Sequence, residues 1–349
     1  MRIFRFLTAA APALVALALA GCSVPAPQDA IAAGLSREAA LSAALPMPDA
    51  EHYATRYLAW DDAARKRPVL AKLYLPAVQA GPVPLIVFSH GIGGSREGYT
   101  YLGKHWAANG YASLHLQHAG SDRSVWFGNP LEMVSRLQNA ARESEAMDRA
   151  LDLRFALDQV LAGEFAERFD PRRIVAAGHS YGANTTLLVS GARVERAGHA
   201  MDFRDPRIQA AVIISAPPFY GESNLTAILA PVQIPTLHIT ATADDIRIPG
   251  YFSAASDRMD VFAATGSRSK TLAVFHDGSH SIFTDRLGTG GQEHNPRVKA
   301  ATRDLAMAFL RTVFDGQSGE LEQWSARHQA IVQRFECAAP TCAARRNSQ

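Results

Sequence analysis

The chain has few cysteines, no excess of charge of one sign and no apolar run long enough to span a membrane. It has 349 residues with 35 Lys+Arg against 33 Asp+Glu, a net charge of +2. No Lys/Arg-rich stretch supplies the basic surface that nucleic-acid binding requires, so we expect no nucleic-acid partner. Hydrophobic residues make up 48% and aromatic residues 8%. This ordinary globular composition excludes wholesale disorder and a multi-span membrane protein.

Cysteine occurs only three times, as Cys22, Cys337 and Cys342. The spacing of the last two is not C-x-x-C, and no histidine lies within eight residues of either, which argues against a redox or metal role. We therefore expect no metal and no cofactor. Cys337 and Cys342 can still form a disulfide, which would stabilise the folded chain locally by about 2 kcal/mol. It would close a loop in a C-terminal tail expected over residues 336–349.

The N-terminal segment has the features of an export signal. Residues 1–21 contain Arg2 and Arg5 but no acidic residue. The rest of the chain therefore has as many basic residues as its 33 acidic ones. Leu7–Ala20 is apolar apart from two residues, about fifteen apolar residues where a membrane helix needs roughly twenty. A basic start, a short apolar stretch and small residues at its end are typical of a signal peptide over residues 1–21.

The end of this segment resembles the lipobox of bacterial lipoproteins. It reads Leu19-Ala20-Gly21-Cys22. The resemblance implies cleavage before Cys22 and lipidation of its thiol and new amino group. Residues 22–50 are then the lipid anchor and an Ala/Pro/Ser-rich tether. Ser23 after the cysteine favours the periplasmic face of the outer membrane in the bacterial cell envelope.

Residues 51–335 have the pattern of one α/β domain. Two β-like runs, Tyr53–Trp60 and Pro68–Leu75, flank a charged turn that we expect in solvent, with Asp61, Asp62, Arg65, Lys66 and Arg67. Apolar runs typical of buried strands then recur at Leu85–Ser89, Tyr111–Gln117, Arg173–Gly178, Ile208–Ser215, Thr236–Thr240 and Lys270–His276. Helical apolar periodicity appears between them, at residues 146–160, and near the end, at 298–313. This alternation predicts a mostly parallel central sheet with helices on both faces.

A G-x-S-x-G motif follows one of these strands. It reads Gly178-His179-Ser180-Tyr181-Gly182, and a helix-compatible run comes after it. A strand-to-helix turn this sharp leaves no room for a Cβ two residues before or after the serine. The turn would lift the Ser180 hydroxyl above the sheet, at a helix N-terminus that favours developing negative charge. Ser180 is the predicted nucleophile.

A serine hydroxyl needs a base, and the base needs a carboxylate to orient it. In α/β-hydrolases the acid and then the histidine follow the serine in the chain. His280 lies just past the last strand and is the predicted base, with His276 as the alternative. Asp244 follows the preceding strand and is the predicted acid, with Asp245 as the alternative. Its role would be to fix the imidazole tautomer and stabilise imidazolium.

Acyl transfer also needs donors for the oxyanion. One should be the backbone N–H of Tyr181, which follows the nucleophile. The loop Ser89-His90-Gly91-Ile92-Gly93-Gly94 follows the first parallel strand, and its Ile92 N–H is the expected second donor.

Three stretches together resemble the α/β-hydrolase branch that holds secreted platelet-activating factor acetylhydrolases and predicted dienelactone hydrolases. They are Leu85–Gly94, Gln117–Asp122 and Gly178–Gly182, and the resemblance spans residues 53–314. It implies a Ser-Asp-His carboxylic ester hydrolase that needs neither metal nor calcium. Ala241 stands where the acid motif commonly has glycine, which loosens the choice between Asp244 and Asp245. The segment containing His118, Asp122, Trp126 and Phe127 either shapes the substrate pocket or is a packed loop.

The sequence therefore predicts an envelope-anchored serine esterase. We expect it to act through an acyl-enzyme on short-chain or acetyl esters, lipid-like ones included. Its partners would be a small-molecule ester and the membrane that holds its lipid anchor. An acyltransferase on the same fold and a non-catalytic binding lipoprotein remain alternatives, and the oligomeric state is open.

Overall fold

The computed structural model describes residues 52–338, except residues 197–198, 220, 249–250 and 318. The predicted signal peptide 1–21, Cys22, the tether 22–50 and Cys342 all lie outside the described residues. No helix in the described part of the chain is both long and apolar enough to cross a membrane.

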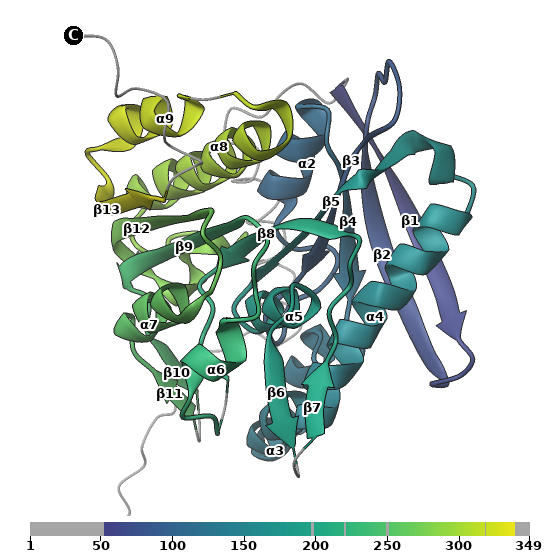
Figure 1. The fold of residues 1–349 in the computed structure, drawn as a ribbon. Coiled ribbons are helices and arrows are strands. Elements are labelled where there is room, and N and C mark those ends of the chain that lie inside the picture. The colour runs from purple at the N-terminus through teal and green to yellow at the C-terminus, as the bar shows by residue number, and fades with distance from the viewer. Residues whose placement is uncertain (1–51, 197–198, 220, 249–250, 318, 339–349) are drawn as a thin grey trace, which may run out of the picture.

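A central sheet organises the described residues (Figure 1). Its strands stand in the order β1-β2-β4-β3-β5-β8-β9-β12-β13. Neighbours from β4 to β12 pair in parallel, while β1, β2 and β13 join antiparallel at the two sides. The bounds are β1 Tyr53–Asp62, β2 Arg67–Pro76, β3 Val83–Ser89, β4 Ala112–Gln117, β5 Phe169–His179, β8 Ile208–Ile214, β9 Thr236–Ala243, β12 Lys270–Ser279 and β13 Val332–Cys337.

Helices cover both faces of the sheet because the parallel strands are apolar on both sides. Along β3, Leu85 and Val87 pack into one core and Ile86 and Phe88 into the other. One face carries α4 (Glu143–Ala162), α5 (Tyr181–Val189), α6 (Leu225–Leu229) and α7 (Ser256–Ala264), and the other carries α2 (Thr100–Ala108), α8 (His294–Asp315) and α9 (Glu320–His328) (Figure 1). The prediction of a mostly parallel α/β sheet between two helical layers is confirmed.

Several small elements had no prediction. They are the hairpins β6 (Arg193–Arg196) with β7 (His199–Asp202) and β10 (Ile246–Ile248) with β11 (Tyr251–Ser253), together with α3 (Met133–Ala140) and the short 3₁₀ helix η2 (Arg123–Trp126). At the other end, β13 runs two residues beyond position 335. The sheet thus continues into the segment expected to be a tail, and Cys337 is its last strand residue.

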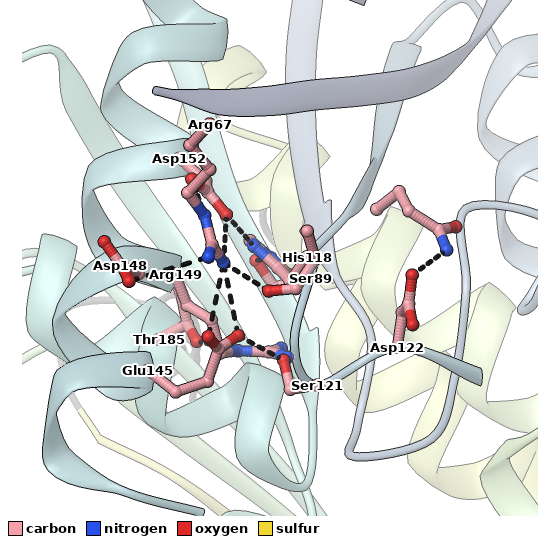
Figure 2. Close-up of polar contacts among 12 residues, drawn as sticks. Arg67, Ser89, His118, Ser121, Asp122, Glu145, Asp148, Arg149, Asp152 and Thr185 are labelled. Carbon is pink, nitrogen blue, oxygen red and sulfur yellow. Dashed lines mark hydrogen bonds and ion pairs between the residues drawn. The ribbon is translucent and has the colours of Figure 1, made fainter. Parts of the chain in front are cut away.

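The charged turn between β1 and β2 is solvated only in part. Asp61 and Lys66 are exposed as expected, but Asp62 is buried and Arg65 and Arg67 are half-buried. Asp62 is only 8% exposed, and Arg65 donates to its Oδ2 at 2.7 Å. Arg67 donates to Oδ1 of Asp152 at 2.9 Å, a carboxylate of α4 with no exposed surface (Figure 2). The prediction was wrong for these residues because α4 crosses beside the hairpin and presents buried carboxylates to it. A single sequence does not show which helix packs there.

Candidate active site

The predicted catalytic and oxyanion residues lie at one edge of the sheet, where the parallel strands end. β3, β5, β8, β9 and β12 are successive neighbours in the sheet, and each is followed at its carboxyl end by a loop or helix. Parallel strands bring their carboxyl ends to the same edge, which is where α/β folds build their sites. Segments more than a hundred residues apart in the sequence meet here.

Ser180 stands in a strained turn between β5 and α5. Its φ is 57° and its ψ is −123°, a conformation that non-glycine residues seldom adopt and that costs about 1–3 kcal/mol. A Cβ on Gly178 would collide with the carbonyl of Gly182, and a Cβ on Gly182 would collide with that of Ser89. The two glycines therefore allow the tight turn that the motif predicts. Ser180 is 9% exposed, and its hydroxyl faces His280.

The structure brings Ser180, His280 and Asp244 into one hydrogen-bonded chain. The Ser180 Oγ and His280 Nε2 are 2.8 Å apart, and the His280 Nδ1 and Asp244 Oδ1 are 2.7 Å apart. With the proton on Nδ1 donated to the carboxylate, Nε2 accepts from the serine. The two alternatives lie elsewhere. Asp245 is paired with Arg247 at 2.9 Å, and His276 is an exposed residue of β12.

Asp244 is fully buried and has several donors besides the histidine. Its Oδ2 accepts from Ser215 Oγ at 2.5 Å and from Thr240 Oγ1 at 2.7 Å. The guanidinium of Arg258 lies 3.5 Å from its Oδ1. Burial raises the pKa of Asp244, but the hydrogen bond and charge of His280 and the charge of Arg258 outweigh it, so the pKa is lowered. The carboxylate therefore stays ionised although Asp244 itself has no exposed surface.

Ser215 is a residue of this site that the sequence analysis missed. It follows β8, is 1% exposed and has a φ of 57°, the same as Ser180. Its Oγ lies 2.7 Å from His280 Nδ1 as well as 2.5 Å from Asp244. The available signal was positional. Ser215 is the last residue of the predicted strand Ile208–Ser215, at the edge of the sheet where the other site residues lie.

His179, the residue before Ser180, was missed in the same way. Its Nε2 lies 3.0 Å from the backbone oxygen of His280, and its Nδ1 lies 2.9 Å from the Tyr99 hydroxyl. That hydroxyl also accepts from the Gly91 N–H at 3.4 Å. Burial, followed by the charge of His280, lowers the pKa of His179 to about 3, so its ring is neutral. A neutral ring thus links the loop after β3 to the backbone of His280.

The predicted oxyanion donors flank Ser180. Tyr181 is the first residue of α5. The loop after β3 passes directly over the serine, since a Cβ on Gly91 would lie 3.2 Å from the Ser180 Cβ. Ile92 is the next residue along that loop, so both predicted N–H groups come from backbone adjoining the Ser180 side chain.

The segment after β4 divides into a packed part and an exposed part. His118 is fully buried and bonds Asp152 and Ser89, which identifies it as a packed residue. Asp122 accepts from Gln117. Trp126 and Phe127 are 41% and 51% exposed, and the Trp126 indole donates to the Gly93 carbonyl at 2.8 Å. The Trp126 indole therefore adjoins the loop that holds Ile92.

His276 at the end of β12 and His280 just after it are four residues apart in the sequence, a spacing that some metal sites use. Both ring nitrogens of His280 are already within 2.8 Å of side-chain oxygens of the chain. Among the described residues no cluster of three or more His, Cys, Asp or Glu side chains has an arrangement that could hold a metal ion.

Comparisons with known proteins agree with this architecture. Residues 75–129 match the family model described as platelet-activating factor acetylhydrolase, isoform II. The solved structure of a ferulic acid esterase from Streptomyces cinnamoneus is similar, with 21% identity, a TM-score of 0.62, and coverage of 83% of this chain and 99% of that one. A cold-adapted esterase from an Arctic intertidal metagenomic library is 18% identical over 68% of this chain and 90% of that one, with a TM-score of 0.49. The chain has the α/β-hydrolase fold.

Proposed function

We propose that the protein is a serine carboxylic ester hydrolase. The observation that carries the proposal is the chain from Ser180 Oγ through the His280 imidazole to Asp244, with separations of 2.8 and 2.7 Å. Nucleophile, base and orienting acid within hydrogen-bond reach are what acyl transfer through a serine requires. The partial match to an acetylhydrolase family model and the likeness to a solved esterase support the same activity.

In the proposed reaction the Ser180 oxygen attacks the ester carbonyl carbon while His280 Nε2 takes the serine proton. The carbonyl oxygen becomes an oxyanion, which the N–H groups of Ile92 and Tyr181 would stabilise. The tetrahedral intermediate collapses, the carbon–alkoxy bond breaks, and His280 gives its proton to the departing alcohol. Water then attacks the acyl-enzyme with His280 again as base, releasing the carboxylic acid and restoring Ser180.

Asp244 is proposed as the acid that orients His280. Its replacement by Asn should lower kcat by about 10⁴, because an amide favours the wrong imidazole tautomer. Asp245→Asn is the matched control, since Asp245 bonds Arg247 and the Ala255 N–H rather than His280. It should keep kcat within about twofold. Equal losses in the two variants would contradict the assignment.

Short-chain and acetyl esters, including lipid-like ones, are the proposed substrates. A rate series on p-nitrophenyl esters from acetyl to palmitoyl tests this proposal, and the fastest turnover should be on the shortest chains. Ser180→Ala should lose at least a thousandfold in rate on every ester, because the nucleophile is gone. Faster turnover of palmitoyl esters would indicate a lipase instead, and an unchanged rate in Ser180→Ala would exclude the proposed mechanism.

We also propose that the enzyme is held at the bacterial envelope by lipid on Cys22. The proposal rests on the sequence Leu19-Ala20-Gly21-Cys22 after a basic and apolar start. Replacing Cys22 by Ala should release the protein from the membrane fraction while its esterase activity stays the same. Retention of the Cys22→Ala protein in that fraction would contradict the anchor.

A further inference from the structure

Arg149 of α4 is a fully buried arginine that lies beside Ser121 and Thr185 in Figure 2. Its Nε donates to Thr185 Oγ1 at 3.0 Å, its Nη1 to Ser121 Oγ at 2.8 Å, and its Nη2 to the carbonyl oxygen of His90. All three acceptors are uncharged. Burial lowers the pKa of Arg149 to about 10, which leaves the guanidinium charged at neutral pH.

The three contacts of Arg149 lie on three different segments around Ser180. His90 belongs to the loop after β3 and is separated from Ile92 only by Gly91. Ser121 belongs to the loop after β4, and its carbonyl accepts the Gly93 N–H at 2.9 Å, on the other side of Ile92. The loop that carries Ile92 is therefore fixed both before and after that residue.

The third contact reaches the other predicted oxyanion donor. Thr185 lies one turn along α5 from Tyr181, and its hydroxyl donates to the Tyr181 carbonyl at 3.2 Å. The guanidinium also lies over the Tyr181 ring, 4.7 Å from its centroid. A single side chain thus contacts residues on both sides of Ser180.

Arg65, in the turn between β1 and β2, has different contacts from Arg149. Arg65 pairs with the carboxylates of Asp62, Asp148 and Asp152, and contacts neither of the two segments that flank Ser180. Such pairs join the β1–β2 hairpin to α4. Arg149 instead donates to backbone and hydroxyl oxygens next to Ser180. Its link to the nearby Glu145 carboxylate runs through the Ser121 hydroxyl, which donates to Glu145 Oε1 at 2.7 Å.

From these contacts we infer that Arg149 is a positioning residue of the oxyanion hole. It fixes the separation of the Ile92 and Tyr181 N–H groups, and its buried charge favours a negative oxygen placed between them. This inference rests on the proposed serine esterase mechanism. Oxyanion donors contribute only when they are held in place before the reaction, and loss of one donor costs about 10²–10³ in kcat.

The test compares Arg149→Met, Arg149→Lys and the matched control Arg65→Met. Hydrolysis of p-nitrophenyl acetate gives kcat and KM, and inhibition by a trifluoromethyl ketone reports on the oxyanion hole, since its Ser180 adduct places a negative oxygen there. Arg149→Met should lower kcat about a hundredfold with KM within about threefold, and weaken the ketone by a similar factor. Arg149→Lys keeps the charge but not the three-way contact, so its losses should be intermediate.

Arg65→Met should lower the urea midpoint of unfolding yet keep kcat and ketone affinity within about twofold. Equal kcat losses in Arg65→Met and Arg149→Met, or a loss in Arg149→Met without weaker ketone binding, would overturn the inference. If Arg149→Met does not fold, Thr185→Val removes at constant shape the hydroxyl that links Arg149 to the Tyr181 carbonyl, and it should still weaken ketone binding severalfold. No weakening there would also overturn the inference. Failure of the proposed function itself would appear differently, as equal activity in wild type and Ser180→Ala.

Discussion

Two serines with the same unusual φ angle lie at the two ring nitrogens of His280. Ser180 and Ser215 both have a φ of 57°, and each follows the end of a strand. The Ser180 Oγ lies 2.8 Å from Nε2 of His280, and the Ser215 Oγ lies 2.7 Å from its Nδ1. Residues in strained conformations cluster at functional sites, where the surrounding structure maintains them. The second serine is thus part of the geometry that fixes His280.

Replacing Ser215 by Ala should lower kcat about tenfold with little change in KM. The hydroxyl donates to Asp244, so its loss leaves more negative charge on the carboxylate facing His280. The same hydroxyl lies 2.7 Å from His280 Nδ1, so the ring also loses a contact that orients it toward Ser180, and a misplaced catalytic group lowers the rate. Ser215→Gly separates the hydroxyl from the strain, because glycine adopts positive φ freely. A Ser215→Ala enzyme with the kcat of the wild type would contradict this role.

At the residue scale, the site residues that belong to a sequence motif were predicted. Those whose role depends on which element packs beside them were missed. Ser180 and His280 follow from a G-x-S-x-G turn and from a histidine just past the last strand. Ser215 and Arg149 carry no motif, because their positions depend on which strand and helix pack beside them. Asp244 was placed by its register after a strand, and the geometry now separates it from Asp245.

At the scale of elements, the long apolar strands were predictable and their order was not. Runs such as Leu85–Ser89 are apolar on both faces, so they must lie in a sheet between two layers of helices. The hairpins β6–β7 and β10–β11 have strands of only three or four residues, too short for a periodic signal. The contact between the β1–β2 hairpin and α4 could not be predicted either, because it depends on ion pairs rather than on the spacing of apolar residues.

The pairing of the hairpin with α4 predicts a large effect of one arginine on stability. Arg67 donates to Asp152, which is fully buried, and to the Ala119 carbonyl. Arg67→Met should lower the free energy of unfolding by about 3 kcal/mol, because it removes a partner from a buried charge. Urea unfolding measures the change. Arg172→Met is the matched control, since its pair with Asp170 is exposed and should leave the unfolding midpoint unchanged. Equal midpoints for both variants would contradict the account.

At the scale of the whole molecule, the fold keeps many histidines neutral. Five of the described histidines are buried, and burial lowers the pKa of each, to about 3 for three, to about 4 for one and well below the usual 6.5 for the last; these are His115, His179, His238, His118 and His90. In the unfolded chain all five would take up protons near pH 6.5. The unfolded state therefore binds more protons than the folded state between about pH 6.5 and 4.

Stability should consequently fall as the pH is lowered from 7.5 to 5. Each neutral histidine contributes a slope of up to about 1.4 kcal/mol per pH unit below 6.5. Glu145 and Asp285, whose pKa values burial raises, act in the opposite direction but are fewer. The urea midpoint, measured at pH 7.5, 6 and 5, should decrease at each step. A constant midpoint over this range would show that these histidines are protonated in the folded protein.

The central claim is that Ser180 is the nucleophile of an acyl-enzyme mechanism. Labelling with a fluorophosphonate, followed by intact-mass measurement and peptide mapping, tests it most directly. The account predicts one adduct per chain, located on Ser180, that forms in step with the loss of esterase activity and is absent from Ser180→Ala. An adduct on another residue would contradict it. Full esterase activity after treatment with the reagent, with no adduct on Ser180, would contradict it as well.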